Sequence, residues 1–163
     1  MNITAGNLYF VSDSFFEKVS DPFLKINYET SQRPHYFSFR EESTGLYWLV
    51  PCSSKVDKFM KIIKDKKDRH KPTDGIRIVT IQDQKSVLLF QDMFPSTVKY
   101  IQKQYIRGGQ PVCVSDPNII KDLEKTAKKV IKLLRHGVRF TPTQPDVKRI
   151  EKLMSDELIH DQK

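Results

Sequence analysis

The chain has 163 residues, of which 38% are hydrophobic and only six are glycine, a composition typical of one globular domain rather than a disordered segment. No run of eighteen apolar residues occurs, and the first ten residues lack a signal-peptide pattern, so we expect a cytoplasmic protein. The net charge of +8 favours a polyanionic partner, most often nucleic acid, although a protein that is simply rich in lysine is the plain alternative.

The first half of the chain is predicted to form short strands and two helices. Residues 7–11 are predicted to form a strand, and a short helix capped by one of the polar residues at 12–14 follows it. Aromatic and β-branched runs at 35–39 and 46–50 predict a hairpin, with Pro51 ending its second strand. A helix with apolar residues at helical spacing should then run to about Arg69, with Ser53 or Ser54 as its N-cap.

The second half is predicted to add strands and then two long helices. Residues 76–81 and 86–90 predict another hairpin, and further strands are expected at 98–106 and 112–114. A helix that Asp116 caps should begin at Pro117 and end at Gly137, and a last helix should begin at Pro145. Strands followed by two helices indicate an α+β fold with an antiparallel sheet.

Two short motifs could bind and process a phosphodiester. Arg33 and His35 flank a proline at the start of a predicted strand, where a permanent cation and a group that titrates near neutral pH would serve that chemistry. Ser53, Ser54 and Lys55 lie between a strand and a helix, a position that favours anion binding. The plain alternatives are a surface arginine, an edge-strand histidine and a serine that only caps the helix.

The predicted helix after Lys55 is strongly basic. From Lys55 to Lys71 the chain has eight Lys or Arg residues and three Asp residues, a net charge of +5 in seventeen residues. Either this is a solvated helix face, or it is a track for RNA phosphates. The residues expected to bind RNA are Tyr36, Lys58, Lys61, Lys64, Lys66 and Lys67. We find no motif for a metal site, a Walker loop or a dinucleotide turn, and we expect no cofactor.

Segments along nearly the whole chain resemble the ToxN/AbiQ family of type III toxin–antitoxin endoribonucleases, and its CptN-like branch in particular. They are GNLYFVSDSFFEKVSDPFLKIN, RPHYFSF, YWLVPCSSKVDKF, SVLLFQDMFP, KKVIKLL and FTPTQPDVKRIEKL. The resemblance implies a compact antiparallel sheet or barrel of the MazF/Kid type in a single domain, 1–163. The basic helix would follow the central strands, and the C-terminal helices, about 116–160, would pack on the barrel.

The resemblance also implies an activity and a partner. Proteins of this family are bacterial toxins that act in phage defence by abortive infection. They cut RNA without a metal, leaving 2′,3′-cyclic phosphate and 5′-hydroxyl ends. Their antitoxin is a small structured RNA, a pseudoknot, which the toxin trims and binds in multimeric protein–RNA assemblies. Carried over by motif, the catalytic residues would be Arg33, His35, Ser53, Ser54 and Lys55. The basic residue at the strand entrance would be Arg33 or His35, Lys58 is an alternative to Lys55, and the acid and the base are unassigned.

Two other functions remain open at this point. A non-catalytic RNA-binding module would use the basic helix as a platform and would leave RNA ends intact. A DNA-binding regulator would use the C-terminal helices as a recognition pair, but we find no strong base-reading signature.

Overall fold

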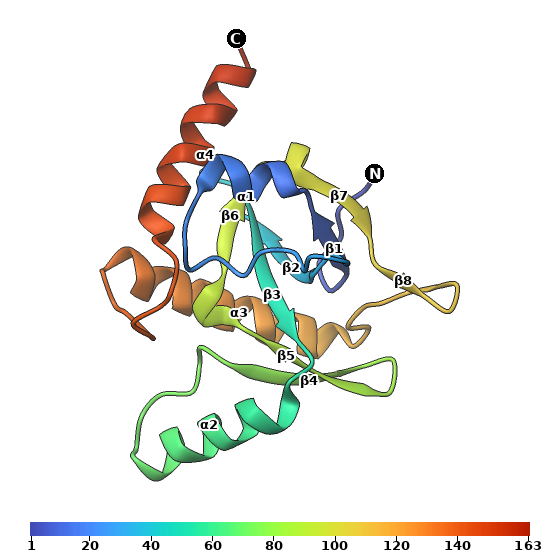
Figure 1. Ribbon diagram of the computed structural model, residues 1–163, viewed down its shortest axis with the longest axis vertical. Coiled ribbons are helices and arrows are strands. Elements are labelled where there is room, and N and C mark those ends of the chain that lie inside the picture. Colours follow the sequence, from blue (N-terminus) through green and yellow to red (C-terminus); the bar gives the residue numbers. More distant parts are fainter.

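The computed structural model describes residues 1–163 and is built around an antiparallel sheet with the strand order β4-β5-β3-β2-β1-β7 (Figure 1). The strands of this order are β1 (Leu8–Val11), β2 (Pro34–Arg40), β3 (Tyr47–Ser53), β4 (Arg77–Ile81), β5 (Gln84–Leu88) and β7 (Ile101–Gln104). β6 (Phe94–Ser96) pairs with β3 beside them, and β8 (Ile106–Arg107) forms a separate ribbon with β9 (Gln110–Pro111). The helices are α1 (Asp13–Val19), α2 (Val56–Asp68), α3 (Pro117–Arg135) and α4 (Val147–Asp161), and η1 (Phe90–Asp92) and η2 (Val98–Tyr100) are short 3₁₀ turns.

β3 is the strand on which the sheet is centred. One of its edges pairs with β2, and its other edge pairs first with β6 and then with β5. The prediction that Pro51 ends this strand is wrong, because β3 continues to Ser53. Proline has no N–H to donate, but the Pro51 carbonyl accepts from the Leu89 N–H at 3.0 Å, so pairing continues past the proline.

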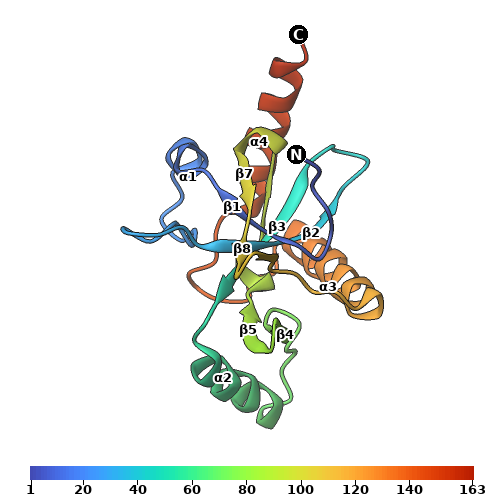
Figure 2. The same cartoon turned by 90° about the vertical axis from the view of Figure 1, so that its right-hand side faces the viewer.

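The two faces of the sheet are covered by different helices. Side chains that alternate along β2 and β3, such as Tyr36 and Val50, join one core with Leu123 and Ala127 of α3. The opposite set, which includes Phe37, packs with α1 and α4 in a second core. Figure 2 shows α1 and α3 on opposite sides of the strands. This arrangement confirms the predicted α+β fold with an antiparallel sheet.

The C-terminal helices begin and end close to the predicted positions. Asp116 caps α3 by accepting from the Asn118 N–H at 2.9 Å, as expected. Gly137 follows the helix with φ +86°, a conformation that favours glycine. α4 begins at Val147, two residues later than predicted, and Asp146 caps it by accepting from the Arg149 N–H.

Several short elements differ from the predictions. The β4–β5 hairpin turns through Gln82 and Asp83 alone, both with positive φ, so its loop is shorter than expected. The strand predicted at 98–106 is divided into η2, β7 and the start of β8. The strand predicted at 112–114 is replaced by β9 two residues earlier, and Cys113 keeps only an isolated bridge to Asn7.

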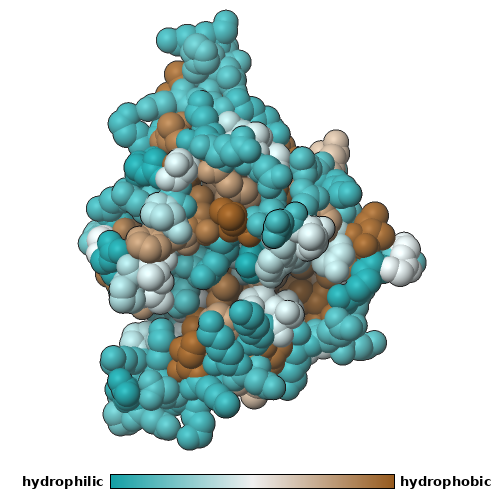
Figure 3. Space-filling view, in the orientation of Figure 1, coloured by the Kyte–Doolittle hydropathy of each residue, from teal (hydrophilic) through white to brown (hydrophobic).

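α2 projects from the lower end of the molecule (Figures 1 and 2). Its buried residue, Phe59, packs with Ile76, Val87 and Leu89 in a small cluster of their own. Its neighbour Met60, which also has helical spacing from the apolar residues Val56 and Ile63, is 46% exposed. Hydrophilic side chains cover the lower end of the surface, where α2 lies (Figure 3). No helix of the chain combines the length and apolar character needed to cross a bilayer.

Candidate active site

A groove of about 220 Å³ lies where β3 ends, beside the β4–β5 hairpin. Its polar and aromatic lining comes from four separate parts of the chain: Tyr28; Ser53 and Ser54; Gln84, Lys85 and Ser86; Tyr105 and Arg107. Four larger cavities, of about 500, 550, 340 and 320 Å³, lie elsewhere and contain none of the predicted catalytic residues. We therefore place the candidate active site in the smaller groove.

The two serines at the end of β3 leave a free hydroxyl in the groove. The prediction that Ser53 or Ser54 caps α2 is wrong, because Lys55 occupies the N-cap position and no side chain caps this helix. The Ser53 hydroxyl accepts from the Lys55 N–H at 3.2 Å. The Ser54 side chain is exposed, and its hydroxyl makes no hydrogen bond within the chain, so it is free to bind a ligand.

Arg33 is fixed next to the groove by several contacts. Its guanidinium donates to the carbonyl of Cys52 at 3.0 Å and to that of Ile26 at 3.3 Å. It also stacks on the ring of Tyr28, 4.5 Å from the ring centroid, and Tyr28 is part of the groove lining. A permanent cation is thus held beside the carbonyl that precedes Ser53, in a geometry that a lysine would not reproduce.

His35 does not reach the groove. Its side chain is fully buried among aromatic residues, with the Phe94 ring centroid 5.4 Å away, and neither ring nitrogen has a hydrogen-bond partner. Burial, reinforced by the charge of Arg33, lowers the pKa of His35 to about 3. The imidazole is therefore neutral near pH 7 and is closed off from solvent, which does not support the predicted acid–base role.

Tyr36 is also placed differently from the prediction. Its ring is fully buried in the core beneath α3, and its hydroxyl has no partner, so it offers no surface to RNA. Burial raises the pKa of this hydroxyl well above its ordinary value. Sequence alternation does put Tyr36 and His35 on opposite faces, but both faces of this strand are covered by helices.

The basic residues of α2 are on the surface, beginning at the groove. Lys55, Lys58, Lys61, Lys64 and Lys67 are exposed, and Lys66 is half-buried. The helix begins directly after Ser54, so its first turn lies next to the groove. Lys64 forms an ion pair with Asp68 in which both groups are exposed to solvent, so the pair is weak and leaves Lys64 able to bind a phosphate.

The structure adds groove residues that the sequence patterns did not indicate. Lys85 and Arg107 bring two further cations, and Tyr28 and Tyr105 bring two aromatic rings. Lys85 lies near the start of β5 and Arg107 in the two-residue strand β8, whereas Tyr28 and Tyr105 lie in connecting segments. No periodicity marks any of the four as a functional residue. The only sequence signal for Lys85 was its place in a predicted hairpin turn.

A buried carboxyl near Arg33 was also missed. Asp92 lies in η1 and is 3% exposed. Burial raises its pKa to about 6, although the nearby charges of Lys25 and Arg33 act in the opposite direction. No group of three or more His, Cys, Asp or Glu side chains lies close enough to form a metal site.

Comparison with known proteins gives matches among solved structures and none in sequence. No protein-family model and no curated protein matches the sequence. Among solved structures, the chain is similar to AbiQ, a lactococcal anti-phage endoribonuclease belonging to the type III toxin–antitoxin system. The TM-score is 0.64 at 11% sequence identity, and the match covers 98% of this chain and 100% of that one. From its first strand to its last helix, the chain has the fold of AbiQ.

Proposed function

We propose that this chain is the toxin of a type III toxin–antitoxin system, a sequence-specific endoribonuclease in a single domain, 1–163. The observation that carries the proposal is the groove at the end of β3, in a chain with the fold of an endoribonuclease. In that groove a free hydroxyl, Ser54, lies among the cations Lys85 and Arg107 and beside the fixed Arg33–Tyr28 pair. This set suits a phosphodiester, which is anionic and becomes more so as it reacts.

The proposed reaction is a metal-independent transesterification. A ribose 2′-oxygen bonds to the adjacent phosphorus, and the bond from phosphorus to the 5′-oxygen breaks. The 2′-hydroxyl loses its proton and the leaving 5′-oxygen gains one, which gives 2′,3′-cyclic phosphate and 5′-hydroxyl ends. Arg33 and Lys55 stabilise the charge of the phosphorane, and Ser53 and Ser54 orient it. His35 is left out of proton transfer, because it is buried and its pKa is about 3.

The proposed RNA path continues from the groove along α2. Lys58, Lys61, Lys64, Lys66 and Lys67 would contact backbone phosphates there. The partner we propose is a small structured antitoxin RNA, a pseudoknot, which the toxin trims and holds in a multimeric assembly. Short tandem repeats ahead of a terminator in the upstream DNA would support this partner.

The test is RNA cleavage in excess EDTA by the wild type and by the variants Ser54→Ala and Arg33→Ala. We expect the wild type to cut and to leave cyclic phosphate ends. Each variant should lose about 10²-fold or more in rate, the usual effect of removing one group that stabilises a transition state. End-labelled RNA resolved on gels measures both the rate and the end chemistry.

Matched controls come from the same elements or from similar exposed positions. Arg40→Ala removes an arginine from the opposite end of β2, and Ser115→Ala removes an exposed serine away from the groove. Both should cut like the wild type. Intact RNA with the wild type would favour the non-catalytic RNA-binding module, and cutting that EDTA abolishes would contradict the metal-independent reaction. Full activity in both Ser54→Ala and Arg33→Ala would remove this site.

A further inference from the structure

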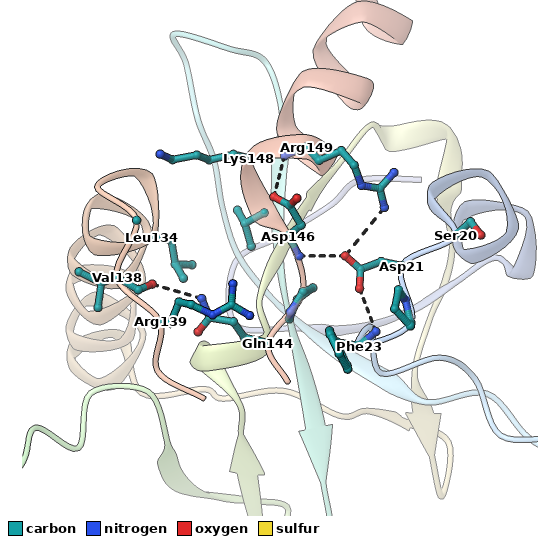
Figure 4. A pocket seen from close by; sticks show the side chains of 14 residues that line it. Ser20, Asp21, Phe23, Leu134, Val138, Arg139, Gln144, Asp146, Lys148 and Arg149 are labelled. Carbon is teal, nitrogen blue, oxygen red and sulfur yellow. Dashed lines mark hydrogen bonds and ion pairs between the residues drawn. The ribbon is translucent and has the colours of Figure 1, made fainter. Parts of the chain in front are cut away.

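A second cavity, of about 500 Å³, lies where α1, α3 and α4 meet (Figure 4). Its walls are the end of α3 with the segment after it, the start of α4, and residues 20–23 after α1. This volume falls within the range of about 300–1,000 Å³ that is usual for ligand sites. It shares no lining residue with the groove at the end of β3, and nothing in the proposed reaction uses it.

Buried polar groups give this cavity a fixed shape. Asp21, which is 8% exposed, accepts from the N–H groups of Phe23 and Asp146, each at 2.8 Å. Gln144, also buried, accepts from the Phe140 N–H and donates to the Val138 carbonyl at 3.2 Å. These bonds join the three walls, so the cavity does not depend on mobile surface side chains alone.

The charges at this cavity favour an anion. Arg149 lies 3.8 Å from Asp21 and donates to the Val19 carbonyl at 2.7 Å, so its charge is already used within the chain. Arg139 and Lys148 are exposed and form no ion pair, and the hydrogen bond of Arg139 goes only to the carbonyl of Pro142. Because Asp21 and Asp146 already accept backbone N–H groups around the start of α4, the anion would be bound by these two side chains.

An exposed aromatic ring completes the site. Phe23 is 40% exposed and lines the cavity below Asp21 in the view of Figure 4. An aromatic face next to unpaired cations is the combination that single-stranded nucleic acid uses, with a base on the ring and phosphates on the cations. An acidic peptide would bind the two cations but would not need to stack on the aromatic ring.

We propose that this cavity is a second RNA-binding site, which holds one base on Phe23 and the neighbouring phosphates on Arg139 and Lys148. The inference rests on the proposed function, in which RNA is the substrate. The site lies apart from the groove, so it would add affinity for long RNA without taking part in cleavage. A short RNA that fills only the groove would not reach it.

The test measures binding of an uncleavable, fully 2′-O-methylated single-stranded RNA of twenty nucleotides over a range of salt concentrations. The variant Arg139→Ala/Lys148→Ala should bind at least tenfold more weakly than the wild type. Its slope of log affinity against log salt should be shallower by about 1.4, the value for two lost phosphate contacts in single-stranded RNA. The RNA affinity of Phe23→Ala should be about 5- to 150-fold weaker than that of the wild type. Phe23→Trp should bind like the wild type, because stacking needs only an aromatic face.

The matched control is Lys152→Ala/Lys163→Ala, which removes two exposed lysines from the far part of the C-terminal region. Equal affinity and equal salt slope in the two double variants would overturn the proposal, and so would unchanged binding by Phe23→Ala. Stronger capture of an acidic peptide than of RNA would overturn it as well. Cleavage of a tetranucleotide should be the same in Arg139→Ala/Lys148→Ala and the wild type. If the wild type cuts no RNA, the proposed function fails, while the binding comparison still decides this inference.

Discussion

The imidazole of His35 packs edge-on against Phe94, 5.4 Å between ring centroids, and both ring nitrogens are buried without a partner. The unfolded chain takes up a proton on this residue below about pH 6.5, whereas burial delays protonation of the folded protein to about pH 3. Between these values the unfolded state binds more protons, so this residue makes folding stability fall as the pH falls. Asp92 acts in the opposite direction, because its raised pKa makes stability fall as the pH rises from about 3.8 to about 6.

Replacing His35 by leucine isolates its contribution. At pH 7.5 the free energy of unfolding should stay within about 1 kcal/mol of the wild type, since an apolar side chain replaces an unsatisfied polar one. At pH 5.0 the wild type should lose about 2 kcal/mol relative to His35→Leu, and the contribution of Asp92 cancels in the comparison. Urea unfolding at the two pH values measures this difference. Parallel pH dependence of the two proteins would contradict the buried, neutral imidazole, as would loss of RNA cleavage in a folded His35→Leu.

At the scale of elements, a helix or strand could be predicted from the sequence where the residues that determine it lie close together in the chain. α3 was recognisable because its cap, its apolar face and its terminal glycine all lie within one stretch of sequence. The end of β3 was not, because pairing with β5, more than thirty residues further along, extends the strand past Pro51. The same non-local packing buries His35 under Phe94 and brings Tyr28, Lys85 and Arg107 to one groove, so local patterns could not show either result.

α2 packs on the sheet through one small apolar cluster. Phe59 is its buried residue, in a cluster with Ile76, Val87 and Leu89. We expect Phe59→Ala to release the helix locally, because the other side chains of α2 that pack against this cluster, Val56, Ile62 and Ile63, are only partly buried. Hydrogen exchange should become more than tenfold faster for the amides of α2 and stay unchanged for those of α3. Met60→Ala, which truncates an exposed neighbour, is the control and should leave both unchanged. Uniformly faster exchange along the chain would show that α2 unfolds only with the whole protein.

At the scale of the whole molecule, Arg135 joins three parts that are far apart in the sequence. From the end of α3 its guanidinium donates to both carboxylate oxygens of Glu41, at 2.8 and 2.9 Å, next to the turn between β2 and β3. It also donates to both carboxylate oxygens of Glu151 on α4. The hydrogen bonds from Arg135 to Glu41 hold the pKa of Glu41 below its usual range. The arginine therefore connects the central hairpin to both C-terminal helices through planar, two-point contacts.

Replacing this arginine should loosen all three parts together. Arg135→Met keeps most of the side chain's length but leaves two half-buried carboxylates without their partner, which should cost about 2–3 kcal/mol of unfolding free energy. Adding Glu41→Gln removes one of the two carboxylates that lack a partner. The double variant should therefore lose less unfolding free energy than the sum of the two single variants. Urea midpoints of the four proteins give the coupling, and Lys152→Ala, which breaks only an exposed pair with Asp156, should move the midpoint little. Additive losses would mean that Glu41 and Arg135 contribute independently, and that their hydrogen bonds do not couple the central hairpin to α3.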